Sequence, residues 1–349
     1  MKIYLSIILF LIPLSTFGKD RYHFSKLSLE SGLSQITVTC IHEDKKGFMW
    51  FGTRNGLNRF DGYRFDVYTT DLENNTSISD NHVQCVAEDA EGNLWVGTSN
   101  GLNRLDKGTE KFKRYFYDSA NPASLSNNTI TAIYFDTNNN LWIGTRDGLN
   151  LYNKATNSFD RIAIDNLLIN NPVNAIVRKD DILYIGTFSQ GLIAYNIADK
   201  QYKVYKNNPD DMKSLSHNHI RAIAIDRNGN LWVGTYHDGV NLLRKGENSF
   251  SFYNTKNGLT DDYVRCIAES PQGEILVGTF NGLNSIDPKT GEITQYKTYG
   301  SNEGDLSHYS IQSIYFDRSQ TLWVGTYAGG INYYSRFGQK FRFLIRVPT

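Results

Sequence analysis

The sequence has no excess of charge of either sign. Its 36 lysines and arginines balance 36 aspartates and glutamates, so the formal net charge is zero. Domains that bind nucleic acid or anionic membrane surfaces usually carry a basic excess, and we therefore expect neither partner here. The mean hydropathy of −0.44 and the 40% of hydrophobic residues are typical of a soluble globular domain.

Long apolar segments are scarce, and the one at the N-terminus is short. Lys2 precedes the apolar run Ile3–Leu14, and Thr16 and Gly18 are small residues at the positions that a signal peptidase reads. The run is too short to span a bilayer comfortably. We expect residues 1–18 to be a signal peptide, the mature protein to be periplasmic, and no direct membrane insertion to follow its removal. A buried first strand is the alternative interpretation.

What the sequence does contain is a repeat. An aromatic or apolar residue is followed by Phe, Val or Ile and then by Gly-Thr, seven times along the chain. The seven copies are Trp50–Thr53, Trp95–Thr98, Trp142–Thr145, Tyr184–Thr187, Trp232–Thr235, Leu276–Thr279 and Trp323–Thr326. Their glycines, at 52, 97, 144, 186, 234, 278 and 325, follow one another at a period in the forties. Such a period, built from short β-rich segments, is typical of propeller blades.

Each repeat reads as four short strands separated by turn residues. In the third copy these are Ile130–Phe135, Leu141–Thr145, Leu149–Tyr152 and Phe159–Ile162. In four copies an Asn-Gly or Asp-Gly dipeptide follows the second strand, which is a strong hairpin signal. The sequence therefore predicts an all-β fold, a seven-bladed β-propeller of four-stranded antiparallel blades, as a single domain over residues 22–345.

The outer strands number one fewer than the blades. Six segments share the pattern: Phe65–Tyr68, Phe112–Tyr115, Phe159–Ile162, Tyr202–Tyr205, Phe250–Tyr253 and Ile293–Tyr296. Phe24–Leu27 and Phe341–Leu344 compete for the seventh place. Because an open ring exposes a strand edge and an apolar face, we predict that Phe24–Leu27 completes the blade that contains Trp323.

The three cysteines share one position of the repeat. Cys40, Cys85 and Cys266 each lie twelve residues before the glycine of their blade, and the other blades have only Ala or Ser there. The position therefore requires a small side chain in the first strand. Since cysteines on different blades should lie too far apart to bridge, we expect free, buried thiols.

The repeat also resembles a known family. The phrase Asp-x-x-Gly-Asn-Leu-Trp-(Val/Ile)-Gly-Thr-x-x-Gly-Leu-Asn, almost whole in Asp89–Asn103 and Asp226–Asn241, resembles the two-component regulator propeller repeat. That repeat is known from the periplasmic sensor region of hybrid two-component system sensor histidine kinases. The resemblance extends from about residue 22 to the C-terminus.

The resemblance implies a ligand-sensing input module for signal transduction. In the family, two propellers precede a β-sandwich, a transmembrane helix and a kinase, so the implied partners are further sensor domains or a second protomer. Nothing here resembles a phosphoacceptor histidine segment, an ATP lid or a receiver site. We therefore expect no kinase activity, and no catalytic activity of any kind, in this chain.

Equivalent positions of the repeat predict a binding rim at one end of the ring. The residues two positions after each repeat glycine should lie at the same end of a blade as the residues fifteen and thirteen positions before it. The candidates are Arg54, Arg146, Phe188, Tyr236, Phe280, Tyr327, His82, His219, Arg221 and Arg265. Aromatic faces beside planar hydrogen-bonding groups suit a glycan fragment or another small ligand, and arginines would suit an acidic sugar. The alternative is that these residues are only the solvated ends of strands.

Signals for catalysis are weak, and we expect neither a cofactor nor a metal. The seven histidines are scattered, and no nucleophile or metal motif is present. The alternative of a secreted lyase stays open, because streptogramin lyases have a similar propeller that uses a rim histidine with acidic groups and Mg²⁺. His237-Asp238 is the nearest match to such a pair. A protein-binding scaffold without a small ligand is the third possibility.

Overall fold

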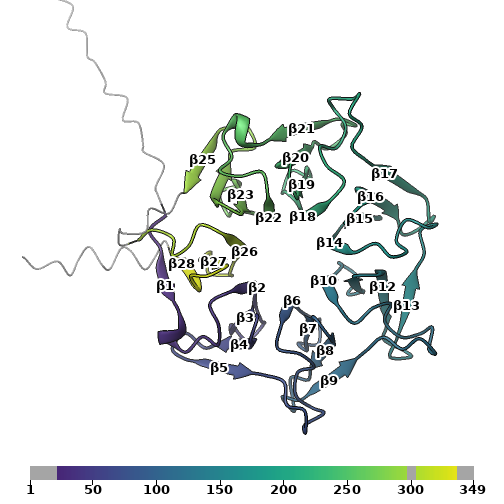
Figure 1. The fold of residues 1–349 in the computed structure, drawn as a ribbon, viewed down its shortest axis with the longest axis vertical. Helices are drawn as coiled ribbons and strands as arrows, with labels where there is room; N and C mark the ends of the chain where they lie inside the picture. Colours follow the sequence, from purple (N-terminus) through teal and green to yellow (C-terminus); the bar gives the residue numbers. More distant parts are fainter. Residues whose placement is uncertain (1–21, 297–303, 336–349) are drawn as a thin grey trace, which may run out of the picture.

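The computed structural model describes residues 22–296 and 304–335 of the chain. Seven four-stranded antiparallel sheets are arranged in a ring around a common axis (Figure 1). The predicted seven-bladed propeller is therefore confirmed. The expected signal peptide, residues 1–18, and the segment Phe341–Leu344 lie outside the described residues.

The strands of blades 1 to 6 follow chain order from the axis outward (Figure 1). Blade 1 consists of β2 (Val38–Glu43), β3 (Met49–Thr53), β4 (Gly56–Phe60) and β5 (Phe65–Tyr68). Blade 2 consists of β6 (Val83–Glu88), β7 (Leu94–Thr98), β8 (Gly101–Leu105) and β9 (Phe112–Tyr115). Blade 3 consists of β10 (Ile130–Phe135), β11 (Leu141–Thr145), β12 (Gly148–Asn153) and β13 (Ser158–Ile162). Blade 4 consists of β14 (Val173–Lys179), β15 (Ile182–Thr187), β16 (Leu192–Asn196) and β17 (Tyr202–Tyr205). Blade 5 consists of β18 (Ile220–Ile225), β19 (Leu231–Thr235), β20 (Val240–Leu243) and β21 (Phe250–Tyr253). Blade 6 consists of β22 (Val264–Glu269), β23 (Ile275–Thr279), β24 (Gly282–Ile286) and β25 (Ile293–Tyr296).

Blade 7 combines both ends of the described chain. It holds β26 (Ile311–Phe316), β27 (Leu322–Thr326), β28 (Ile331–Tyr334) and, as its outer strand, β1 (Ser25–Leu27). The prediction that the N-terminal segment closes the ring is thus confirmed, and Figure 1 shows β1 beside β28. In the described ranges the only helices are the one-turn 3₁₀ helices η1 (Leu29–Ser31) and η2 (Thr255–Asn257), and none is long and apolar enough to cross a membrane.

The glycine of each Gly-Thr pair lets the next blade approach. Gly97 pairs with Cys85 across β6 and β7, and a Cβ atom on Gly97 would lie 2.6 Å from Cγ2 of Ile130 in blade 3. A side chain there would push the blades apart, which explains both the glycine and the small residue opposite it.

The cysteines behave largely as predicted. All three are free, although they are partly rather than fully buried, because the first strand borders the axis instead of the packed interface. Burial, opposed by hydrogen bonds from Thr39 and from the backbone of Gly52, raises the pKa of Cys40 to about 12. Its thiol therefore stays protonated at neutral pH.

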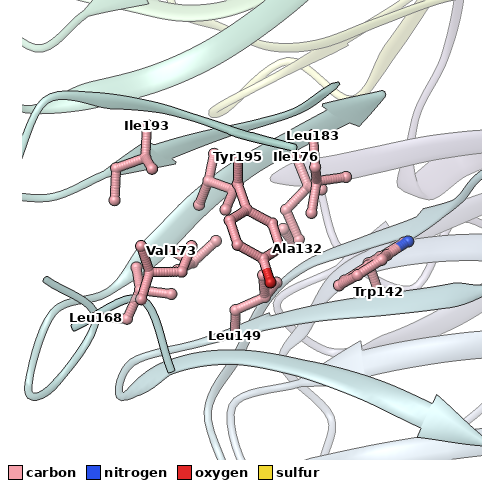
Figure 2. Close-up of a cluster of buried hydrophobic side chains, with 11 residues drawn as sticks. Ala132, Trp142, Leu149, Leu168, Val173, Ile176, Leu183, Ile193 and Tyr195 are labelled. Carbon is pink, nitrogen blue, oxygen red and sulfur yellow. The ribbon is translucent and has the colours of Figure 1, made fainter. Parts of the chain in front are cut away.

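Apolar side chains fill the spaces between blades. Between blades 3 and 4, Trp142 and Leu149 pack with Val173, Ile185 and Tyr195, all of them buried (Figure 2). Neighbouring blades therefore bury each other's faces, and the ring forms one continuous unit.

The tryptophan of the repeat is also a hydrogen-bond donor. Trp95 Nε1 donates to Asp89 Oδ2 at 3.0 Å, while Asp89 Oδ1 accepts the backbone N–H of Asn93 at 2.8 Å. The same indole-to-aspartate bond occurs in five blades. In blade 6, Ser270 and Leu276 occupy the two positions together. The aspartate thus stabilises both its turn and the buried indole nitrogen.

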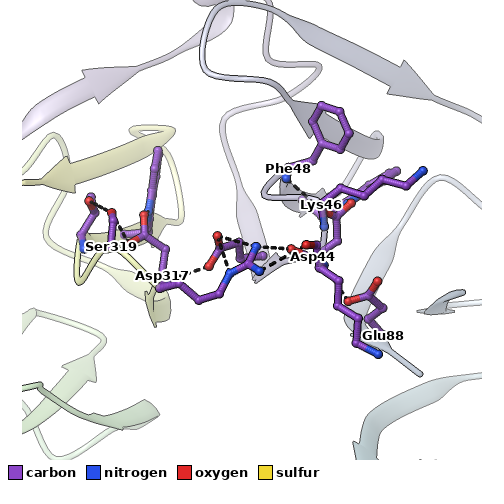
Figure 3. A network of polar contacts seen from close by, with 12 residues as sticks. Asp44, Lys46, Phe48, Glu88, Asp317 and Ser319 are labelled. Carbon is purple, nitrogen blue, oxygen red and sulfur yellow. Dashed lines mark hydrogen bonds and ion pairs between the residues drawn. The ribbon is translucent and has the colours of Figure 1, made fainter. Parts of the chain in front are cut away.

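Charged side chains on the face opposite the predicted rim join neighbouring blades. At the seam of blades 7 and 1, the backbone N–H of Arg318 donates to Glu43 Oε2 at 2.7 Å and its guanidinium donates to Asp44 O at 2.6 Å (Figure 3). Arg227 binds Glu269 in the same way between blades 5 and 6. Arg318 and Arg227 are therefore each matched with a glutamate of the next blade.

Candidate ligand-binding rim

The rim is the end of the ring at which the first strand begins and the second strand ends. In blade 5 the backbone N–H of Tyr236 donates to His219 O at 3.0 Å, and in blade 6 that of Phe280 donates to Tyr263 O at 3.0 Å. These bonds place the two sets of predicted positions side by side. Equivalent positions of the repeat therefore meet at one end of the ring, as predicted.

A buried polar cluster holds the rim loops in place. In blade 2, Ser79 Oγ lies 3.1 Å from Thr98 Oγ1, and the Ser79 backbone N–H donates to Asn103 Oδ1 at 2.9 Å. Equivalent asparagines accept the corresponding backbone bond in six blades. Blade 4 has Ile193 at this position instead. The rim is thus built on a fixed frame, with blade 4 as the exception.

Aromatic side chains form a continuous series over blades 4 to 6. The ring of His219 lies 4.3 Å from that of Phe188 and is stacked at 4.7 Å and 10° on that of Tyr236. Tyr236 contacts Tyr263 at 4.4 Å, and Tyr263 is nearly parallel to Phe280, with centroids 6.1 Å apart. Such a row offers several ring faces to one ligand.

The series continues across blade 7 to blade 1. The ring of Phe280 lies 6.4 Å from that of Tyr309, which stacks on His308. His308 lies 6.3 Å from Tyr327, and the guanidinium of Arg54 lies 5.0 Å from the Tyr327 ring centroid. We call the whole row the aromatic arc: Phe188, His219, Tyr236, Tyr263, Phe280, Tyr309, His308 and Tyr327.

A polar cavity adjoins the blade 4 end of the arc. Its volume is about 460 Å³, and blades 2 to 5 form its wall. Four of the predicted residues line it: Arg146, Phe188, His219 and Arg221. Amide and hydroxyl groups supply much of the remaining wall, including Gln84, Thr131 and Asn174.

The other six predicted residues lie on the same rim outside the wall of this cavity. Tyr236, Phe280 and Tyr327 belong to the aromatic arc. Arg54 and Arg265 lie against its rings, with Arg265 5.0 Å from Tyr263 and 5.1 Å from Phe280. His82 stands apart in blade 2, where its Nδ1 lies 3.0 Å from Ser99 Oγ.

The pKa values of two rim histidines, His219 and His82, are lowered. Burial is the main cause that lowers the pKa of His219 to about 4, and the nearby Arg221, His217 and His237 lower it further. Burial, followed by the charge of Arg54, also lowers the pKa of His82. Both rings therefore offer hydrogen bonds without adding positive charge.

Several rim residues were not among the sequence candidates. Tyr309 and His308 extend the arc from a loop position that the comparison of repeats did not include. Asn174 lines the cavity, but blade 4 is shifted by one residue against the repeat, which hid the equivalence. A repeat alignment that allowed this shift would have found Asn174.

The rim provides no assembled metal centre. Within residues 22–296 and 304–335, no three His, Cys, Asp or Glu side chains come together to hold a metal ion. The ring of His237 instead packs edge-on against Tyr236 at 4.2 Å. His82 and His219 lie on different blades, as expected, and share no contact.

Comparison with known proteins agrees with the geometry. The model of the two-component regulator propeller matches residues 32–55, 77–100, 124–147, 214–237, 247–281 and 305–328. Six of the seven blades are two-component regulator propeller repeats. The matches fall in every blade except blade 4, which is also the blade that lacks the buried asparagine.

Two relatives are a domain of a hybrid two-component system and a histidine kinase. The extracellular domain of the hybrid two-component system BT3049 of B. thetaiotaomicron is 30% identical, with a TM-score of 0.79 over 90% of this chain. A histidine kinase P4 of Formosa agariphila is 45% identical over 60 residues, which is 17% of this chain. The chain spans 42% of the BT3049 domain and 4% of the kinase.

A third similarity concerns the fold alone. Virginiamycin B lyase of Staphylococcus aureus is 12% identical, with a TM-score of 0.68 over 90% of this chain and 99% of the lyase. At this identity the similarity shows the propeller architecture and carries no argument about activity.

Proposed function

We propose that this propeller is the ligand-sensing input module of a two-component system, exported to the periplasm, and that an oligosaccharide binds on its rim. The module would pass the signal to further sensor domains or to a second protomer. The propeller itself transforms no ligand.

The observation that carries the proposal is the junction of the aromatic arc with the polar cavity. Phe188 and His219 belong to both, so ring faces and planar hydrogen-bonding groups meet at one place. Sugars need this combination, because their CH faces stack on rings while their hydroxyls require donors and acceptors. The likeness to the BT3049 extracellular domain supports a sensor role for a propeller with such a rim.

The test is calorimetry against a library of glycan fragments. At least one class should bind with a dissociation constant in the micromolar range, which corresponds to about −8 kcal/mol. Tyr236→Ala and Arg146→Ala should each weaken that binding. Tyr63→Ala is the matched control, because Tyr63 is an exposed aromatic residue outside the rim.

Three results would contradict the proposal. A ligand that binds Tyr236→Ala and Arg146→Ala with unaltered affinity would place the site elsewhere. Turnover of a ligand that disappears in His237→Ala would favour the lyase alternative. Binding of a protein partner without any glycan would favour the scaffold alternative.

A further inference from the structure

The residue at the β-bulge of each inner strand projects at the rim. All seven first strands pair with the second strand through a register shift next to their starting residue. A bulge bends the strand locally and re-aims one side chain. In blades 5 and 6 the residues at this bulge are Arg221 and Arg265.

In blades 1, 3 and 4 this residue binds the neighbouring blade. Thr39 Oγ1 donates to Val83 O at 2.7 Å, and Asn174 Nδ2 donates to Ile220 O at 2.9 Å. Thr131 makes the same kind of bond to the carbonyl of the next blade. A short polar side chain at the bulge therefore serves the assembly of the ring.

Arg221 and Arg265 make no such hydrogen bond to described residues of the neighbouring blade. The Nε atoms of both are buried and have no hydrogen-bond partner, and no ion pair of the described residues includes either guanidinium. On the opposite face, Arg318 and Arg227 are matched with carboxylates. Unpaired buried donors are costly and point to a missing acceptor.

The two charges also act on each other. Burial lowers the pKa of Arg265, and the positive charge of Arg221 lowers it further. The guanidinium of Arg265 lies 5.0 Å from the ring centroid of Tyr263 and 5.1 Å from that of Phe280. Beside Arg221, the side chain of His219 is only 9% exposed, and its Nε2 has no partner. The structure thus places two guanidiniums and a neutral imidazole on neighbouring blades of the rim.

We propose that Arg221 and Arg265 form an anion subsite that binds the carboxylate or sulfate of an acidic oligosaccharide, while the aromatic arc stacks on its sugar rings. This inference rests on the proposed function of the rim as a glycan site and names the class of glycan. Guanidiniums suit both oxyanions because their N–H groups match two oxygens at once.

The test compares acidic oligomers with their neutral counterparts. The probes are uronic acid oligomers and sulfated disaccharides, each paired with its carboxyl-reduced or desulfated form. For at least one pair, calorimetry should show the acidic form binding about 10 to 100 times more tightly, as loss of a charge-assisted hydrogen bond predicts. Arg221→Met or Arg265→Met should abolish this preference, since methionine keeps most of the stem volume. Arg64→Met, which removes an exposed charge outside the rim, should retain it.

The failures of the two proposals are distinguishable. If the neutral form of every pair binds as tightly as the acidic form, the anion subsite is wrong and the glycan site stands. If no oligomer binds, the glycan site is wrong. The anion subsite is then tested by comparing the melting temperature in sodium sulfate with that in sodium chloride at equal ionic strength. Sulfate stabilises most proteins, so the wild-type protein should gain several degrees more than the double variant of Arg221 and Arg265. An equal gain would overturn the subsite.

Discussion

Arg178 of blade 4 donates from Nη1 to Asp136 Oδ2 of blade 3 across 2.7 Å, and their side chains are 10% and 0% exposed. In the strand register Arg178 occupies the position of Glu43 in blade 1 and Glu88 in blade 2, one residue before the position of the aspartate that binds the tryptophan in five blades. Burial alone would raise the pKa of Asp136, but hydrogen bonds from Asn140, Trp142 and Arg178 hold it below its usual value. Blade 4 therefore contributes a hydrogen-bond donor to the buried aspartate of blade 3.

Removal of this arginine should destabilise the ring. In Arg178→Met, Asp136 stays buried with fewer donors, and we expect the free energy of unfolding to fall by about 2 to 4 kcal/mol in urea. Lys154→Met is the control, because the pair of Lys154 with Glu91 is 70% and 45% exposed and should contribute less than about 1 kcal/mol. Equal losses in the two variants would show that the buried contact is unimportant.

The indole-to-aspartate bond should appear as coupling between its two residues. We expect Asp89→Ser and Trp95→Leu to destabilise the protein, and the double variant to lose at least about 1 kcal/mol less than their sum. Blade 6 already carries this pair of residues as Ser270 and Leu276. Strict additivity in urea unfolding would argue against the bond as a stabilising contact.

The repeat made the architecture predictable. The Gly-Thr strands, the hairpins and all six outer strands lie where the pattern placed them, since each blade repeats the same local signals. Closure by the N-terminal strand was predictable because an open ring leaves an exposed edge. Equivalent positions also placed the ten candidate residues on one rim.

Contacts between blades were harder to predict. The bond from Arg178 to Asp136 joins different repeats, and a pattern within one repeat contains no information about it. The cavity depends on which short side chains of blades 2 to 4 meet the larger ones of blades 4 and 5. The partial exposure of the cysteines depends on the width of the ring at its axis. These features depend on distances between blades, and the period of the repeat contains no information about those distances.

A buried histidine should make the protein sensitive to acid. Burial, opposed by the charges of Asp44 and Glu43, lowers the pKa of His42 to about 4. As the pH falls, His42 of the unfolded chain binds a proton near pH 6.5, whereas His42 of the folded protein binds one only near pH 4. The stability that depends on neutral His42 is therefore fully present above pH 6.5 and is lost as the pH falls toward 4. Three other blades have Ala at this position, namely Ala87, Ala224 and Ala268.

His42→Ala should therefore remove part of the acid sensitivity. Between pH 7.5 and pH 5, the wild-type protein should lose about 2 kcal/mol more than the variant in urea unfolding. His237→Ala, which changes an exposed rim residue, serves as the control and should follow the wild type. Parallel pH profiles for wild type and His42→Ala would refute the expected role of His42.

The N-terminal strand should be essential for a closed ring. Ser25 pairs with Tyr333 and Leu27 with Ile331, and Phe24 is buried with Leu306 and Leu276. Deletion of residues 19–30 should lower the melting temperature sharply, because it uncovers β28 and this apolar cluster. Deletion of residues 340–349 should matter little. The reverse ranking in a thermal scan would overturn the assignment of the closing strand.

The pairing of β1 with β28 also imposes an order in time. The closing strand is made near the start of synthesis, and its partner follows only after roughly 300 further residues, on the order of 15 to 60 seconds of translation. Throughout that interval the apolar side chain of Phe24 has no finished blade to cover it. Ring closure therefore cannot precede the synthesis of β28, and conditions that slow translation prolong the interval in which β1 can associate with other molecules.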